Sequence, residues 1–371
     1  MITRTLKTLA VILAAATTVF ATPRTPARTI FDDFLQAEML EFTLEVDLSE
    51  LIENRRTEDY LPAVFTFEDA SGKEISQEIK VKPRGKFRRR VCNFPPLMLN
   101  FSKGQLEEEG YLPEYDKLKL VTHCLDDKTT SKEQVMREFL AYKLYNELTD
   151  QSYRVQLAKV TYVDTKGKVG KIKRYGFIIE DTDEMAHRLG GEECEDCHGL
   201  SSSNNLVLAS ENRLAVFQYM IGNTDWDLNM VRNVKMVNLN GGGAVIPVPY
   251  DFDFSGLVNA PYAIPNSEIG QLTIRQRVFQ GLEGERKLFE QTLRHFLSKR
   301  ERLVEVVEQF KGLSWESRND MVNYLDTFFR DVELILEGGQ PQDGSLQRAI
   351  LEHAREDIKP ESGANNSTLG K

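Results

Sequence analysis

The strongest constraint on the fold of this chain lies between residues 222 and 256, where two apolar segments flank a glycine turn. Residues 233–239 and 244–250 are rich in Val, Ile and Met. The sequence between them, Asn-Gly-Gly-Gly at 240–243, is typical of the turn that joins two antiparallel strands. The stretch therefore predicts a β-hairpin.

The open end of this hairpin is expected to gather oxygen-bearing side chains. In a hairpin centred on the glycine turn, Asn233 lies opposite Tyr250 and hence beside Asp251. The segment before the first strand, which carries Asp225 and Asn229, lies at the same end. Carboxylate and amide oxygens are the ligands that Mg²⁺ prefers, so a divalent-metal site is expected there. An Asp-x-Asp after an apolar strand also occurs in glycosyltransferases that use nucleotide sugars, which is a competing interpretation.

Two motifs in this stretch resemble the spore-coat protein H (CotH) kinase family. The family has a Gly-Asn-x-Asp-Trp motif, found here at 222–226, and an apolar strand that ends in Asp-x-Asp, found here at 251–253. The resemblance implies that Asp225 is the catalytic Asp and that Asp251, with Asp253 beside it, binds the metal. The family spacing favours Asn229 as the amide ligand, whereas the hairpin count favours Asn233. Both remain candidates.

The resemblance implies a fold and an activity. The expected fold is α+β and two-lobed, like a protein kinase, with an antiparallel sheet and one helix in an N-lobe at 36–180. A mostly helical C-lobe at 181–356 carries the catalytic hairpin. Such a protein binds ATP with Mg²⁺ or Mn²⁺ and transfers the γ-phosphate to a Ser or Thr hydroxyl of a protein substrate. The alternative is a catalytically inactive binding module, because Lys86-Phe87 and Phe94-Pro95 stand where the family has Asn-Ser/Thr and paired lysines.

The candidate ATP-binding residues lie in the first half of the chain. Apolar residues recur at helical spacing from Ser131 to Leu148 and predict a helix with Ser131 as its N-cap. Glu138 lies in the middle of that helix and is the expected acidic partner of an ATP-binding lysine. The candidates for that lysine are Lys82, Lys86 and Lys119, with a solvated surface charge as the alternative role for each.

Two further positions come from the resemblance alone. The family has an Arg-Gly on an early strand, which is matched by Arg84-Gly85. It also has a strand of the type Gly-x-Tyr/Phe-x-x-x-Glu, which is matched with shorter spacing by the segment that ends at Glu180. Arg84 and Glu180 are therefore expected to contribute to ATP binding.

The two ends of the chain predict export and flexible segments. Residues 1–21 have a positive start and a 13-residue apolar core that ends in Val-Phe-Ala, which is typical of a signal peptide. That core is too short to span a bilayer, so we expect a periplasmic or extracellular protein without a membrane anchor after cleavage. Residues 22–35 are expected to form a flexible leader. The polar residues 357–371, which follow a last predicted helix at 345–356, are expected to be disordered.

The charge balance bears on possible partners. The formal net charge is −10, which disfavours sequence-independent nucleic-acid binding because such binding depends on Lys and Arg. The segment 80–90 is a local exception with seven basic residues, which either form a solvated hairpin tip or face phosphates.

The four cysteines fall into two pairs. Cys92 and Cys124 flank neighbouring predicted strands and are expected to form a disulfide in an oxidising compartment. Cys194-x-x-Cys197-His198 has the pattern of c-type haem attachment, which makes a haem protein a second alternative function. The surrounding loop is short and acidic, with little apolar sequence to enclose a porphyrin, and this favours a tight disulfide or a partial metal site instead.

Overall fold

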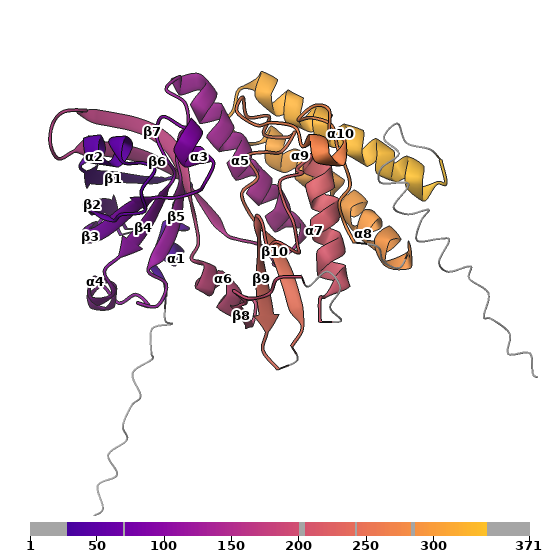
Figure 1. Cartoon of the computed structure of the whole chain (residues 1–371), viewed down its shortest axis with the longest axis horizontal. Helices are drawn as coiled ribbons and strands as arrows, with labels where there is room; N and C mark the ends of the chain where they lie inside the picture. The colour runs from indigo at the N-terminus through magenta and orange to yellow at the C-terminus, as the bar shows by residue number, and fades with distance from the viewer. Residues whose placement is uncertain (1–27, 70, 200–204, 242, 283–285, 340–371) are drawn as a thin grey trace, which may run out of the picture.

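The structure is a computed structural model, and it describes residues 28–69, 71–199, 205–241, 243–282 and 286–339. Figure 1 shows the strands of the first half gathered at one end of the molecule and the C-terminal helices at the other, with helix α5 between them. The α-helices are α1 (Ile30–Phe34), α2 (Leu48–Glu53), α3 (Arg88–Val91), α4 (Lys103–Glu108), α5 (Lys128–Leu148), α6 (Thr182–Arg188), α7 (Leu208–Ile221), α8 (Arg286–Ser298), α9 (Arg300–Glu308) and α10 (Trp315–Leu336).

Seven strands of the first half close into a barrel in the order β1-β2-β3-β4-β5-β7-β6. Neighbouring strands are antiparallel except at the closure, where β1 and β6 run parallel, with Phe42 paired to Val160. The strands are β1 (Leu40–Val46), β2 (Leu61–Glu68), β3 (Glu74–Pro83), β4 (Leu97–Phe101), β5 (Lys117–Val121), β6 (Val155–Asp164) and β7 (Lys171–Ile179).

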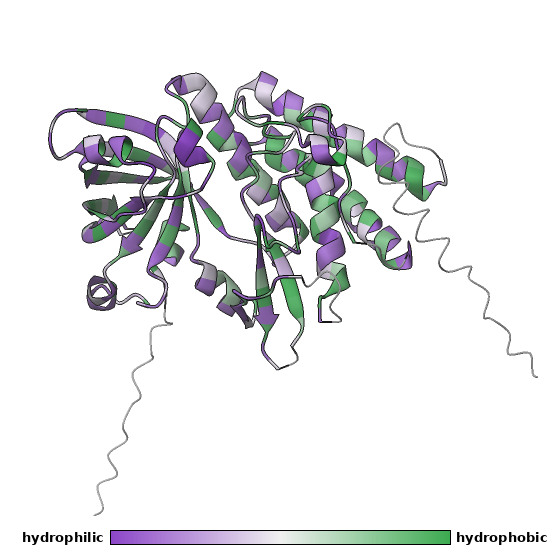
Figure 2. Cartoon of the chain, in the orientation of Figure 1, coloured by the Kyte–Doolittle hydropathy of each residue, from purple (hydrophilic) through white to green (hydrophobic). Residues whose placement is uncertain are grey.

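The barrel interior follows from the period-two pattern of its strands. Along β3, buried residues alternate with more exposed residues from Glu74 to Pro83, and Figure 2 shows a similar alternation of hydrophobic and hydrophilic residues along the barrel strands. The ring of Phe34, on α1, packs against Phe65 and Phe67 with centroid distances of 5.6 and 5.1 Å. Residues 28–35 were expected to be part of a flexible leader. The prediction is wrong for these residues, because they include helix α1, which packs into the barrel core.

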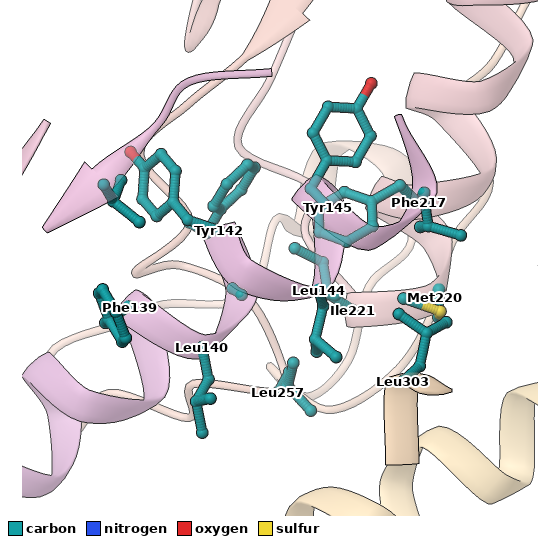
Figure 3. Packing of buried hydrophobic residues seen from close by; sticks show 14 of the residues in the cluster. Phe139, Leu140, Tyr142, Leu144, Tyr145, Phe217, Met220, Ile221, Leu257 and Leu303 are labelled. Carbon is teal, nitrogen blue, oxygen red and sulfur yellow. The ribbon is translucent and has the colours of Figure 1, made fainter. Parts of the chain in front are cut away.

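Helix α5 lies between the barrel and the C-terminal helices. Its N-cap is Asp127, which accepts a hydrogen bond from Thr130 N, and not the expected Ser131. Figure 3 shows its side chains packed on several sides, with Tyr145 beside Phe217 of α7 and Leu144 beside Ile221. One hydrophobic core runs through α5 from strands β5, β6 and β7 to helices α7–α10.

The second sheet has three strands in the order β10-β9-β8. Strands β9 (Val234–Leu239) and β10 (Val245–Pro249) form the expected hairpin, and β8 (Gly191–Glu193) pairs with β9. Helix α7 packs against β10 and ends at Gly222, which has a left-handed backbone with φ of 66°. A Cβ at Gly222 would lie 2.1 Å from the hydroxyl oxygen of Tyr324, so only glycine fits there.

The prediction of a two-lobed, protein-kinase-like α+β fold is wrong. The first half forms a closed barrel, and a three-stranded sheet and the helices follow it. The closure depends on pairing between β1 and β6, which are more than a hundred residues apart in the sequence, and hydrophobic periodicity carries no information on such pairing. The helices at 286–298, 300–308 and 315–336 agree with the expectation that the segment 181–356 is mostly helical. The predicted signal peptide at 1–21 and the predicted segments at 345–371 lie outside the described residues.

Candidate functional site

A pocket of about 440 Å³ lies where the loop after β3 meets the open end of the β9–β10 hairpin. Its polar lining combines basic side chains, carboxylates and one amide, namely Arg84, Lys86, Arg88, Arg232, Asp225, Asp251, Asp253 and Asn233. A larger hollow of about 710 Å³ lies over strands β1–β4, but its lining lacks such a cluster of carboxylates and guanidinium groups. The smaller pocket is therefore the candidate functional site.

The hairpin register that was counted from the sequence is confirmed. Val234 pairs with Pro249, and Tyr250 N donates a hydrogen bond of 3.0 Å to Asn233 O. Asn233 thus lies beside Asp251, and both line the pocket. Asn229 is exposed and is not part of the pocket lining, so the structure brings Asn233 and not Asn229 to the site.

Asp225 is held by the residues that precede β9. Asn233 Nδ2 donates to the backbone oxygen of Asp225 at 2.6 Å and to its carboxylate Oδ2 at 2.9 Å. Arg232 Nε lies 3.5 Å from the other carboxylate oxygen. Burial raises the pKa of Asp225, while Arg232 opposes the shift. A carboxylate with a raised pKa and a fixed orientation is suited to accept a proton from a hydroxyl group.

Arg88 is the centre of the buried end of the pocket, and no motif in the sequence predicted this position. Its Nη2 donates to both carboxylate oxygens of Glu138 at 2.9 Å and to Asp251 Oδ1 at 3.0 Å. Its Nε donates to Asp253 Oδ2 at 2.7 Å. Arg88 lies in a run of basic residues, so nothing in the sequence distinguishes it from Lys86 or Arg90.

The charges of this cluster do not balance. One oxygen from each of Glu138, Asp251 and Asp253 lies within 4.8 Å of the others, and one guanidinium neutralises only one of the three carboxylates. Burial raises the pKa of Glu138 to about 8 against the opposing effect of Arg88, and burial and Asp253 raise the pKa of Asp251. A proton on one of the carboxylates or a bound divalent cation would supply the missing positive charge.

The three carboxylates differ in access. The side chains of Glu138 and Asp253 are 4% exposed, whereas that of Asp251 is 33% exposed. Asp251 is therefore the carboxylate of this cluster that a ligand in the pocket can reach, and Arg88 and Glu138 form its buried support.

Backbone conformation adds to the evidence for a site. Val231, Asn233 and Asp251 line the pocket and have positive φ angles of 49°, 53° and 64°. Positive φ is disfavoured for side chains with a Cβ, above all for a β-branched residue such as Val. The strained Asp251 is held in place because its backbone N donates to the Tyr142 hydroxyl of α5 at 2.8 Å. Such strain gathers at functional sites.

The expected ATP-binding residues are only partly brought together. Arg84 and Lys86 line the pocket, and among the described residues neither side chain has a carboxylate partner within salt-bridge distance. Lys82 lies outside the pocket, with its ammonium 4.8 Å from the centre of the Tyr60 ring. Glu138 was expected to pair with one of the candidate lysines. Its cationic partner is instead the guanidinium group of Arg88.

Lys119 and Glu180 also lie outside the pocket lining. Lys119 Nζ donates to Thr182 Oγ1 at 2.5 Å, and burial lowers the pKa of Lys119 to about 7. Glu180 is fully buried and accepts hydrogen bonds from Arg154 and Arg188 at 2.7 Å each. These contacts connect the residue before β6 and the residue after β7 with α6, and they give Glu180 a structural role.

Both expected cysteine pairs form disulfides. Cys92–Cys124 spans 32 positions and anchors α3, since Cys92 N donates to Arg88 O at 2.9 Å. Cys194–Cys197 follows β8, and the exposed His198 comes next in the chain. Covalent haem attachment at this motif requires both thiols, so this disulfide would first have to be reduced.

A comparison with protein-family models gives no match for this chain, and a comparison with curated protein sequences gives none either. Among the residues that the structure describes, none of the helices has the length and the apolar character needed to cross a bilayer.

Proposed function

We propose that the protein is an exported, metal-dependent phosphotransferase that uses ATP, as the resemblance of its two motifs to CotH kinases implies. The acceptor is a Ser or Thr hydroxyl of a protein substrate. The observation that carries the proposal is the convergence of Asp225, Asn233 and Asp251 with Arg84 and Lys86 in one pocket. Phosphoryl transfer needs carboxylates for a metal and for the acceptor hydroxyl, together with cations for the phosphates.

The residues have distinct roles in this proposal. Arg84 and Lys86 bind phosphate oxygens, because they line the pocket without carboxylate partners among the described residues. Asp225 orients the acceptor hydroxyl and accepts its proton, and Asn233 fixes the carboxylate of Asp225 through the 2.9 Å hydrogen bond. Arg88 holds Asp251 and Asp253 in place, so it is a positioning residue.

The donor set suits Mg²⁺ or Mn²⁺. Arg88 contacts one oxygen of Asp251, which leaves the second oxygen of this carboxylate as a metal ligand, and Asn233 lines the same pocket. A bound metal ion would neutralise the charge on the transferred phosphate. Asp251, the exposed member of the cluster, is the main protein ligand in this proposal.

A second candidate is a nucleotide-binding module without catalysis. The contacts of Arg88 with all three carboxylates favour it, because an internal cation already supplies part of the charge that a metal would supply. The haem alternative stays a prediction that would need the Cys194–Cys197 disulfide to open.

The deciding experiment is incubation of the purified full chain with γ-labelled ATP and Mn²⁺, with and without an extract that supplies acceptors. We expect labelled protein with the wild type and none with Asp251→Asn. The control is Asp183→Asn, which changes an exposed carboxylate at the start of α6, outside the pocket. Nucleotide binding without any transfer would select the binding module, and no binding at millimolar ATP and Mn²⁺ would contradict both candidates.

A further inference from the structure

The Cys194–Cys197 disulfide is less buried than the other disulfide of the chain. Both of its cysteines are half-buried, whereas Cys92 and Cys124 are 1% and 5% exposed. Glu195 and Asp196, between the two cysteines, are exposed. A dissolved thiol therefore reaches this sulfur pair more easily than the Cys92–Cys124 bond, which the fold shields.

The short loop of this disulfide argues against a purely structural role. The two cysteines are three positions apart, against 32 for Cys92 and Cys124. A disulfide that closes a short loop removes little entropy from the unfolded chain, so it stabilises the fold less than one that closes a long loop.

The disulfide is connected to a wall of the pocket. Its sulfur-bearing residues pack, with Val231, against a small core that contains Trp226 and Leu228. Gly199 N, two residues after Cys197, donates to Asn229 O at 3.0 Å. The segment 227–233 is tied by two backbone hydrogen bonds between Asp227 and Arg232, of 3.0 and 2.9 Å, and it supplies part of the pocket lining.

We infer that Cys194–Cys197 is a redox-active disulfide that exchanges with dithiol reductants and adjusts the 227–233 wall of the pocket. A thiolate of the reductant attacks one sulfur, the S–S bond breaks, and the other sulfur leaves as a thiolate. The second thiol of the reductant, as thiolate, then attacks the mixed disulfide. The two electrons and two protons of the dithiol end on Cys194 and Cys197, and the reductant becomes a disulfide. The effect on the pocket rests on the proposed function, whereas the exchange does not.

The test is a titration of the oxidised full chain with dithiothreitol in native buffer. Free thiols are trapped by alkylation and located by mass spectrometry. In a Trp315→Phe background, Trp226 is the remaining tryptophan and reports on the core beside the disulfide. We expect Cys194 and Cys197 to be alkylated while Cys92–Cys124 stays closed, and the emission of Trp226 to change and to return on reoxidation.

The control is Cys194→Ser/Cys197→Ser, which should show no change in emission with dithiothreitol. A Cys194–Cys197 bond that resists reduction until the protein unfolds, or that opens only after Cys92–Cys124, would overturn the inference.

A second experiment measures ATP binding with Mn²⁺ in both redox states, and we expect affinities that differ by about fivefold or more. Equal affinities would overturn the link to the pocket. A protein that binds no ATP in either state refutes the proposed function instead. The alkylation of the thiols and the emission of Trp226 are measured without nucleotide, so they still decide whether the disulfide exchanges.

Discussion

Arg88 Nη2 donates to both carboxylate oxygens of Glu138, at 2.9 Å each. The pair joins the short helix α3 to the central helix α5 beneath the pocket, and the same guanidinium reaches Asp251 and Asp253. The polar floor of the site is therefore one connected ionic cluster, and a change in any member acts on the others.

Arg88→Met should lower the free energy of unfolding by about 3–5 kcal/mol, because it leaves buried carboxylates without their cation. Urea denaturation measures the loss. Millimolar Mg²⁺ or Mn²⁺ should restore part of it by replacing the missing charge. The matched control is Arg90→Met, two residues on, where the side chain is exposed. Equal losses in the two variants would show that the ionic cluster does not stabilise the fold.

Asp225→Asn should lower the rate of phosphoryl transfer by about 100-fold or more, since it removes the proton acceptor. ATP and Mn²⁺ should still bind, because Asp251 remains. Steady-state kinetics and isothermal titration calorimetry separate the two effects. A variant that loses binding and transfer together would assign Asp225 to the metal rather than to the acceptor hydroxyl.

Glu211→Gln should make the protein more stable at pH 8 than the wild type. Glu211, on α7, is 2% exposed, and burial raises its pKa to about 7. Between its unfolded pKa near 4.5 and pH 7, the folded protein keeps a proton that the unfolded chain has released, so stability falls as the pH rises through this window. Gln stays neutral and can still accept the 3.0 Å hydrogen bond from Leu282 N.

We expect the stability difference between Glu211→Gln and the wild type to grow by about 1–3 kcal/mol from pH 5 to pH 8 in urea titrations. The control is Glu192→Gln, at an exposed position on β8, which should leave the pH profile unchanged. Parallel profiles for the wild type and Glu211→Gln would mean that Glu211 is ionised in the folded protein throughout this range.

Gly222→Ala should lower the free energy of unfolding by about 2–5 kcal/mol. The backbone of Gly222 is left-handed, and a Cβ there would lie 2.1 Å from the hydroxyl oxygen of Tyr324. Gly190→Ala is the control, because Gly190 also has a positive φ, of 78°, but its Cβ would meet open space. Thermal or urea unfolding should show a much smaller loss there. Tyr324→Phe should reduce the cost of Gly222→Ala, and additive losses in the double variant would refute the steric explanation.

The hairpin and its polar end were predictable because their information is local. The glycine turn fixes the register, so counting from it brings Asn233 beside Asp251 without any knowledge of the rest of the fold. The C-terminal helices show their own periodicity for the same reason. Residues that act through distant partners left no such signal. Lys119 and Glu180 resemble ATP-binding residues in type, yet their contacts with Thr182, Arg154 and Arg188 place them elsewhere.

Arg88 is the clearest example of a site residue that the sequence alone could not predict. Its role depends on Glu138, 50 positions away, and on Asp251 and Asp253, more than 160 positions away. Composition gives a basic run at 80–90 but not which of its members turns inward. The Cys92–Cys124 bond, which the sequence predicted, anchors α3 but does not distinguish Arg88 from the other members of the run.

The parallel pairing of β1 with β6 has a consequence for how this protein meets other chains. A closed barrel offers no unpaired strand to which a foreign strand can add. In the three-stranded sheet, β10 contains Pro247 and Pro249, which lack the N–H that such an addition needs. Of the strands that the structure describes, this leaves β8, which leads into the Cys194–Cys197 loop, as the place where a β-strand from a partner can extend a sheet.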